Sequence, residues 1–275
     1  MVKIPKLEDD PHRLNYMLNK TTIKRERRSN RLGMAAIGNP CLRAMWLKFR
    51  WGREVELPRR VKRIFALGDA CEIIVIDALK ELGLEITDQQ EEVAGWGGHI
   101  WGYTDGRITK VPGAEKTVHL LEVKSMNDRI FKTVKKDGVI EAKHEHYVQM
   151  TNYMGKLNLE RALYCAINKN DSEIHTERIR FCKTDYKEFM SRGIDVISHE
   201  IAPPNLFQTE TAQACKWCDF VPICYQGEPA LKSCRTCVRV DIEDEGKWSC
   251  NLHQKELSFE EQQIGCDQYR PLEIK

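Results

Sequence analysis

Cysteine placement is the feature of this sequence that most restricts how the chain can fold. The chain has 275 residues and 11 cysteines, and most of the cysteines lie near the C-terminus. The N-terminus lacks the apolar core and cleavage site of a secretory signal, which favours a cytoplasmic protein. Because thiols stay reduced in the cytoplasm, this clustering of cysteines predicts metal ligation rather than disulfide bonds. The seven cysteines concerned are Cys215, Cys218, Cys224, Cys234, Cys237, Cys250 and Cys266.

Composition excludes some classes of protein and leaves others open. The 43 basic and 41 acidic residues give a net charge of +2, which says little about partners. Hydrophobic residues make up 41% of the chain, enough for one sizeable core. Charged residues make up 31%, and no apolar run approaches the roughly 18 residues of a membrane-spanning helix. Membrane insertion is therefore excluded as a default.

The order of predicted elements indicates an α/β protein with a mixed sheet. Residues 1–35 are polar and contain a basic run from Lys20 to Arg31, which is either a solvated helix face or a phosphate contact. Good helix formers ending at a glycine predict one helix, and apolar runs bounded by turn residues predict strands. Helices are expected over 66–82 and 139–157, and strands over 118–124, 162–167 and 174–181.

Two acidic positions and a lysine form the strongest candidate for a catalytic group. Asp105 precedes the predicted strand that carries Glu122, Val123 and Lys124. Side chains alternate along a strand, so Glu122 and Lys124 share one face. If Asp105 lies beside that strand, two carboxylates and an ammonium converge, which suits Mg²⁺ or Mn²⁺ and phosphodiester hydrolysis. The triplet alone is equally compatible with an ordinary surface ion pair.

Four motifs that follow one another along the chain favour the catalytic interpretation over the surface ion pair. They are Leu67-Gly68-Asp69-Ala70-Cys71-Glu72, Gly102-Tyr103-Thr104-Asp105-Gly106, Leu121-Glu122-Val123-Lys124-Ser125 and Gln149-x-x-x-Tyr153. With them the sequence resembles the PD-(D/E)XK nuclease superfamily. Within it, the sequence is similar to the RecB-like branch, which includes CRISPR-associated adaptation exonucleases and the AddB nuclease domain. The resemblance implies a restriction-endonuclease-like mixed sheet flanked by helices.

The resemblance also implies roles for individual residues. Asp105, Glu122 and Glu72 would hold the metal, and Lys124 would act as the general base or position the water. Many members of the branch carry histidine where this chain has Glu72, which leaves the metal preference open. Gln149 and Tyr153 would contact DNA from one helix face. Arg43 and Lys48, with the basic run, are expected along the phosphate backbone.

The cysteines divide into two groups. Cys215, Cys218 and Cys224 have C-x-x-C-x5-C spacing, and the resembling subfamily adds one earlier cysteine, here Cys41, to ligate a four-iron four-sulfur cluster. Tetrahedral zinc accepts the same four thiolates, so spacing alone leaves the metal open. Either the iron-sulfur cluster or zinc would link the two ends of the nuclease domain, which is a structural role.

The second group is predicted to bind zinc in a ribbon-like tail. The candidates are Cys234, Cys237, Cys250 and Cys266, with His253 as the substitute for Cys266. Free thiols in an unstructured tail are the alternative. The predicted division is a basic segment at 1–35, a RecB-like nuclease domain at 36–228 and a zinc-ribbon-like tail at 229–275.

The predicted function is a Mg²⁺- or Mn²⁺-dependent DNA nuclease, an exonuclease acting on DNA ends or single strands. The alternatives are a non-catalytic DNA-binding or assembly module, a redox protein and an endonuclease. No G-x-x-x-x-G-K-[ST] loop is present, so unwinding would need a partner. A helicase, a recombinase or a CRISPR adaptation protein is the expected class of partner, in DNA recombination, repair or a phage pathway.

Overall fold

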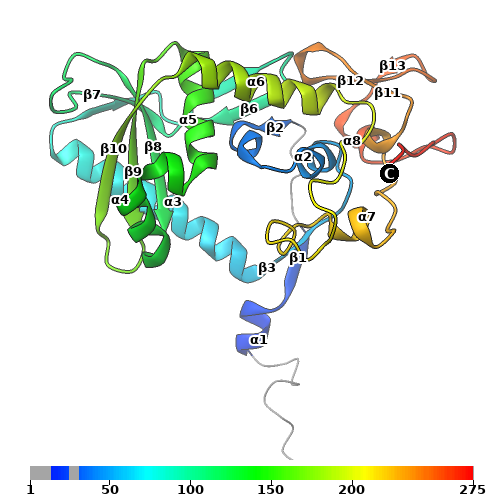
Figure 1. Ribbon diagram of the computed structural model, residues 1–275, viewed down its shortest axis with the longest axis horizontal. Helices are drawn as coiled ribbons and strands as arrows, with labels where there is room; N and C mark the ends of the chain where they lie inside the picture. Colours follow the sequence, from blue (N-terminus) through cyan, green and yellow to red (C-terminus); the bar gives the residue numbers. More distant parts are fainter. Residues whose placement is uncertain (1–13, 25–30, 275) are drawn as a thin grey trace, which may run out of the picture.

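The centre of the molecule is a five-stranded mixed sheet (Figure 1). The computed structural model describes residues 14–24 and 31–274. Strands β8 and β9 are parallel, whereas the other neighbours in the order β10-β9-β8-β7-β4 are antiparallel. The strands are β4 Glu85–Thr87, β7 Gly106–Thr109, β8 His119–Met126, β9 Arg161–Asn168 and β10 Ile174–Arg180. Because parallel neighbours need a long crossover, helices α4 Asp128–Ala142 and α5 His144–Leu157 connect β8 to β9.

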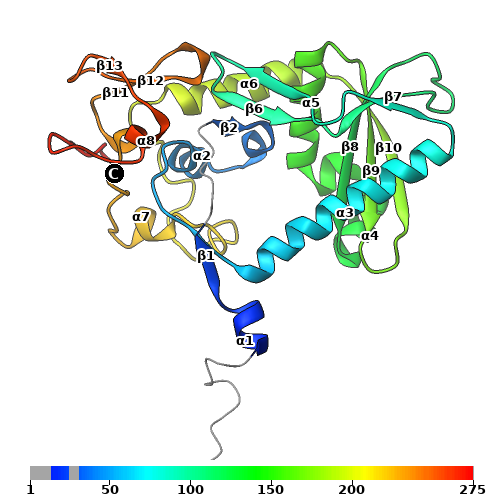
Figure 2. The same cartoon turned by 180° about the vertical axis from the view of Figure 1, so that it is seen from behind.

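Helices cover both faces of this sheet. The long helix α3 Arg59–Glu81 crosses one face, and α4 and α5 lie on the other (Figure 1, Figure 2). Alternation along β8 explains this, because Leu121 and Val123 pack with α3 while Leu120 belongs to the core on the α5 side. The expected α/β class, with a mixed sheet flanked by helices, is confirmed.

The predicted elements differ from the observed ones mainly at their ends. The predicted strands at 118–124, 162–167 and 174–181 correspond to β8, β9 and β10. The predicted helix at 66–82 begins earlier, at Arg59, in a stretch without apolar periodicity. The helical structure expected over 139–157 is confirmed except at Lys143, where one helix ends and another begins. The first of these, α4, starts well before the predicted range, at Asp128, and has a positive φ of 79° at Gly138.

A second, three-stranded sheet extends the core beyond α5. Its order is β2-β6-β5, with β2 parallel to β6. Strand β6 packs closely on α5, because a Cβ added at Gly102 would lie 2.1 Å from the Tyr153 hydroxyl oxygen. The remaining elements of this part are β2 Leu32–Gly33, η1 Met34–Gly38, α2 Leu42–Phe49, β5 Glu92–Gly95, β6 Ile100–Tyr103 and α6 Lys183–Ser198.

The N-terminal part is described only in pieces. Helix α1 Leu14–Asn19 leads to β1 Thr22–Lys24, which pairs with β3 Glu56–Pro58. Half of the basic run between Lys20 and Arg31, residues 25–30, lies outside the described residues. Arg31 is described, and it forms an ion pair with Glu92 at 2.6 Å.

The C-terminal part is built mostly of loops and short elements, and it packs on α2 (Figure 1). Trp248 is fully buried in the main hydrophobic core, and its ring lies 5.1 Å from that of Phe49. The predicted boundaries at 35 and 228 stay predictions. Within the described residues, no helix has the length and apolarity to cross a bilayer. The elements are α7 Val221–Tyr225, η2 Cys234–Thr236, β11 Val240–Ile242, η3 Asp244–Gly246, β12 Trp248–Cys250, β13 Lys255–Glu256 and α8 Phe259–Gln262.

Candidate functional site

The pairing of β7 with β8 brings Asp105 beside the Glu122-Val123-Lys124 triplet. Asp105 comes directly before β7, whose first residue, Gly106, pairs with Leu121. The backbone N–H of Val123 donates a hydrogen bond of 2.6 Å to Asp105 Oδ2. The Asp105 carboxylate is therefore fixed against the backbone between the other two catalytic candidates.

Glu122 is a buried carboxylate with little compensation. Its side chain is 0% exposed, and Lys124 Nζ forms an ion pair with its Oε1. Within the described residues, neither oxygen has a hydrogen bond of regular geometry. The pKa of Glu122 is raised to about 7, mainly by burial and also by Asp105 and Glu72, against the opposing effect of Lys124. A buried carboxylate in this state favours a nearby cation.

Lys124 keeps its charge in this environment. Burial alone would lower its pKa, but Glu122 and Asp105 act in the opposite direction, and the net result is a pKa above the ordinary value. The side chain is therefore an ammonium in this arrangement, which donates hydrogen bonds to oxygen atoms.

Helix α3 contributes Glu72 from the opposite side of the group. Burial raises the pKa of Glu72, with Asp105 as the next cause, and Gln90 Nε2 donates a hydrogen bond of 3.3 Å to Glu72 Oε1. Asp69, one helical turn earlier, also raises this pKa. Asp69 and Gln90 were not among the predicted site residues. The i, i+3 spacing of Asp69 and Glu72 was the signal for the first, and nothing in the sequence pointed to Gln90.

The structure brings Asp105, Glu122, Lys124 and Glu72 together, but it places two of the expected DNA-binding residues elsewhere. Tyr153 is 2% exposed and donates its hydroxyl proton to Tyr103 O at 2.9 Å. Its packing against Gly102 hides it, so its contact in this structure is with the backbone of β6. Gln149, on the same helix α5, remains partly exposed.

Arg43 also has a different environment from the one expected. It is 1% exposed, and its NH1 donates to Pro203 O at 3.0 Å. Burial raises the pKa of Cys224, and the Arg43 guanidinium, which contacts this thiol, partly opposes that rise. A side chain this deeply enclosed does not lie on a DNA-facing surface, so the expectation of a phosphate contact is corrected to an internal structural role.

Four distant cysteines share one neighbourhood. Cys41 is the N-cap of α2, where its sulfur accepts a hydrogen bond from Ala44 N at 3.4 Å. Burial raises the pKa values of Cys218 and Cys224, and the charge of Cys41 raises both further. Cys215 acts on Cys218 in the same way, and its sulfur lies 3.9 Å from the Tyr225 hydroxyl. The predicted group of Cys41, Cys215, Cys218 and Cys224 is therefore close in space.

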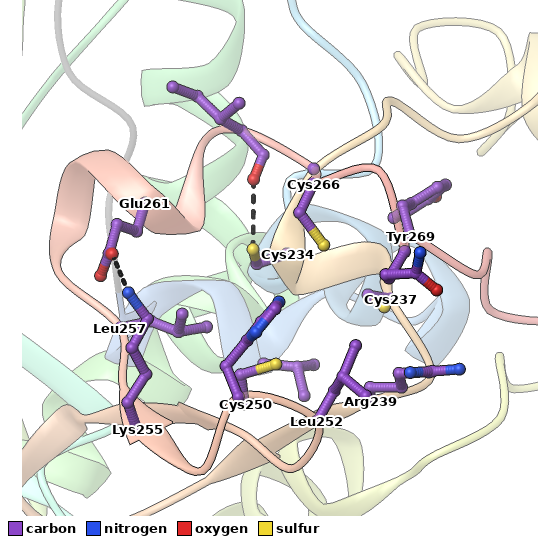
Figure 3. Close-up of a pocket in the computed structure, with 15 residues that line it drawn as sticks. Cys234, Cys237, Arg239, Cys250, Leu252, Lys255, Leu257, Glu261, Cys266 and Tyr269 are labelled. Carbon is purple, nitrogen blue, oxygen red and sulfur yellow. Dashed lines mark hydrogen bonds and ion pairs between the residues drawn. The ribbon is translucent and has the colours of Figure 1, made fainter.

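The second cysteine group surrounds a cavity of about 540 Å³ in the C-terminal part (Figure 3). Burial raises the pKa of Cys234 to about 11, and Cys266, Cys250 and Cys237 follow as causes. Cys234 Sγ donates a hydrogen bond to Ile264 O at 3.1 Å. All five predicted ligands line the cavity: Cys234, Cys237, Cys250, Cys266 and His253.

Neither the carboxylate group nor the two cysteine groups has the geometry of a metal site in this structure. Over residues 14–24 and 31–274, no three His, Cys, Asp or Glu side chains are positioned to hold a metal ion. The donor chemistry nevertheless fits: two sets of thiols, and a buried carboxylate whose oxygens lack regular hydrogen bonds.

A buried arginine joins the C-terminal part to α2, and no sequence pattern predicted its burial. The Arg235 guanidinium lies 3.9 Å from the ring centroid of Trp51 and 4.2 Å from that of Trp248. Its NH1 donates to Phe49 O at 2.8 Å, and its Nε and NH2 donate to Gln262 Oε1. Such a position depends on four segments that meet only in the folded chain.

Comparisons with known proteins give structural similarity at low identity. No family model matches the chain, and no curated protein is similar to it in sequence. An alkaline exonuclease from Laribacter hongkongensis is 15% identical, with a TM-score of 0.47, over 62% of this chain and 87% of that one. The same enzyme in complex with dAMP gives 14%, 0.45, 62% and 87%. A phage-related exonuclease from Haemophilus somnus 129PT gives 17%, 0.40, 58% and 80%.

Proposed function

We propose that this protein is a Mg²⁺- or Mn²⁺-dependent DNA nuclease with a restriction-endonuclease-like core, acting as an exonuclease on DNA ends or single strands. The observation that carries the proposal is the hydrogen bond from Val123 N to Asp105 Oδ2. It holds one carboxylate against the strand that presents Glu122 and Lys124. A third carboxylate, Glu72, approaches from α3.

Each residue has a distinct part in this proposal. Asp105, Glu122 and Glu72 would hold the cation, because hard oxygen ligands are those that Mg²⁺ and Mn²⁺ prefer. The bound cation would activate water and offset charge on the scissile phosphate. Lys124, an ammonium in this arrangement, would position the attacking water, and it would serve as the general base only in its neutral form. Gln149, still partly exposed on α5, contacts the DNA strand.

Digestion of end-labelled DNA tests this function. Single- and double-stranded substrates are incubated with Mg²⁺, Mn²⁺ or EDTA, with the wild type and with Lys124→Ala. Cleavage that needs the metal and falls by at least about 100-fold in Lys124→Ala is expected. Lys132→Ala is the matched control, because Lys132 forms an exposed ion pair with Asp128 on α4.

The outcome that contradicts the proposal is a wild-type protein, with its metal centres intact, that binds DNA and cleaves none. That result would favour a non-catalytic DNA-binding or assembly module. The pattern of labelled ends separates exonuclease from endonuclease cleavage. A helicase, a recombinase or a CRISPR adaptation protein would be the partner that supplies unwound strands or uses the product.

We also propose that the two cysteine groups are structural metal centres. Cys41, Cys215, Cys218 and Cys224 would hold a four-iron four-sulfur cluster, since four thiolates are its normal ligands. Cys234, Cys237, Cys250 and Cys266 would hold zinc, with His253 as the substitute for Cys266. The mutual effect of the thiols on their pKa values supports the first site, and the shared cavity supports the second.

A further inference from the structure

Helix α3 exposes a long face that the described residues leave uncovered. The helix has 23 residues, which corresponds to about 34 Å. Its buried residues, Cys71, Val75, Ile76 and Leu79, all lie in the C-terminal half and pack on the sheet. Figure 1 shows that the N-terminal half continues past the sheet toward β3. The helix is therefore longer than the surface it covers.

The uncovered face is apolar in its middle. Ala66, Leu67, Ala70, Ile73 and Ile74 follow one another at the i, i+1, i+4, i+7 and i+8 spacing of a single helix face. Leu67 is 50% exposed, Ile73 60% and Ile74 55%. A continuous exposed apolar stripe of this kind is typical of an interaction surface.

Charged residues lie at both ends of the stripe, with opposite signs. Arg59 and Arg63 lie before it, and Asp77 and Glu81 lie after it, and all four are exposed. Basic residues at a helix N-terminus and an acidic residue at its C-terminus act against the helix dipole. Arg63 donates hydrogen bonds to Leu18 O and Asn19 Oδ1 of α1. This placement of charges therefore destabilises the isolated helix, and a partner with opposite charges at each end would offset the effect.

The sequence of α3 is complementary to itself when read in both directions from Ala70, its central residue. In an antiparallel pair centred there, Arg59 lies opposite Glu81 and Arg63 lies opposite Asp77. Every two-fold dimer uses the same patch on both copies, so the patch must complement itself. Arg59 and Arg63 meet that condition, because each faces an acidic residue, whereas Arg60 lies opposite Lys80.

The apolar positions obey the same relation. Leu67 lies opposite Ile73, Ala66 lies opposite Ile74, and Ala70 lies opposite its own copy. A small residue at the crossing point lets two helices approach closely. We propose that α3 pairs with α3 of a second copy of this chain, antiparallel about a two-fold axis through Ala70.

The chemistry of the face favours a second copy over DNA. A surface for a DNA backbone would be basic along its length, whereas Asp77 and Glu81 at one end would repel phosphate. The large exposed side chains of Leu67, Ile73 and Ile74 also have no use against a phosphate backbone. The proposal does not depend on the nuclease activity, because the stripe excludes Glu72 and Asp69.

Charge exchange across the two-fold axis tests the pairing. Sedimentation velocity of the full chain over a wide range of concentrations is expected to show a monomer–dimer equilibrium. Arg59→Glu and Glu81→Arg should each weaken the dimer on the order of tenfold, since each change creates two like-charge contacts. The double variant Arg59→Glu/Glu81→Arg should regain most of the wild-type affinity. Lys187→Glu, an exposed change of the same kind on α6, is the matched control.

Ile74→Lys supplies an independent measurement, because a charge placed in the stripe should leave only monomer. The proposal is overturned if the wild type is monomeric throughout, or if Ile74→Lys still dimerises. It is also overturned if the charge variants sediment like the wild type while Arg59→Glu weakens DNA binding, a result that would assign the face to DNA. Circular dichroism of each variant verifies that α3 stays folded.

Discussion

Two regions of the molecule place their candidate functional residues by different means. One is the region around the five-stranded sheet, called here the sheet half, and the other is the cysteine-rich C-terminal part, called here the cysteine-rich half. In the sheet half, Asp105 and Glu122 are placed by strand pairing, through the ladder that matches Gly106 with Leu121. In the cysteine-rich half, the thiols come from loops and short helices. Strand pairing therefore places the backbone of the first site without a ligand, whereas the second region is expected to depend on the proposed metals that would join its thiols.

The two cysteine groups also differ in how much chain they connect. Cys41 precedes α2, far from Cys218 and Cys224 in the sequence, and α2 contributes Trp46 and Phe49 to the main core. The group at Cys234 and Cys250 connects segments that are near one another in the sequence. Loss of the first group should consequently reach the main core, and loss of the second should stay local.

Removal of one ligand from each group is the strongest test of this difference. Cys218→Ser should remove iron, bleach the absorption near 400 nm and destabilise the fold on the order of 5 kcal/mol. Hydrogen exchange should show lost protection in α2 and α7. Cys250→Ser should remove zinc, keep iron and expose mainly β11, β12 and β13. Equal exposure of both halves in the two variants would contradict the comparison, and a colourless wild type with two zinc ions would exclude the iron cluster.

The contact of Arg235 with two tryptophans should have the next largest effect. Arg235→Met removes three hydrogen bonds from a buried guanidinium and leaves Phe49 O without that donor. A loss of about 2 kcal/mol in the free energy of unfolding is expected. Urea denaturation measures it, with exposed Arg270→Met as the control, for which less than about 0.5 kcal/mol is expected. A Gln262 variant as costly as Arg235→Met would place the coupling in that hydrogen bond alone.

The pH dependence of the sheet half should give the smallest effect. Burial, together with the nearby Lys124, lowers the pKa of His146 from 6.5 to about 4. Between these pH values His146 is protonated in the unfolded chain but neutral in the folded chain. The free energy of unfolding therefore falls as the pH drops from 6.5 toward 4. His146→Gln should reduce this fall by about 1 kcal/mol, measured by urea denaturation. An unchanged slope in His146→Gln would refute the assignment.

Local patterns in the sequence were enough to predict most of the sheet. The runs around Leu121 and Leu163 are apolar because both faces of these strands are covered, and such runs are recognisable without a structure. The break between α4 and α5 at Lys143 was not recognisable, because no glycine or proline stands at residues 139–148 to mark it.

The candidate site was predictable where residue type and spacing carry the chemistry. The grouping of Asp105 with Glu122 and Lys124, and of Cys41 with Cys218, followed from motifs. Burial of single polar residues did not follow, because it depends on elements distant in the sequence. Tyr153 is hidden by β6, and Arg43 is enclosed near Pro203, although both residue types are usually exposed.

The hairpin of β7 and β8 has a consequence for how the chain can change in length. Asp105 and Glu122 lie at its open end, and the connecting loop at residues 110–118 lies at the other end, beyond the pair Ile108 and His119. Added or deleted residues in that loop leave the ladder, and with it the spacing of the carboxylates, unaltered. The distance between these two acids along the sequence is therefore free to drift in evolution, and the loop is a natural insertion point for a label.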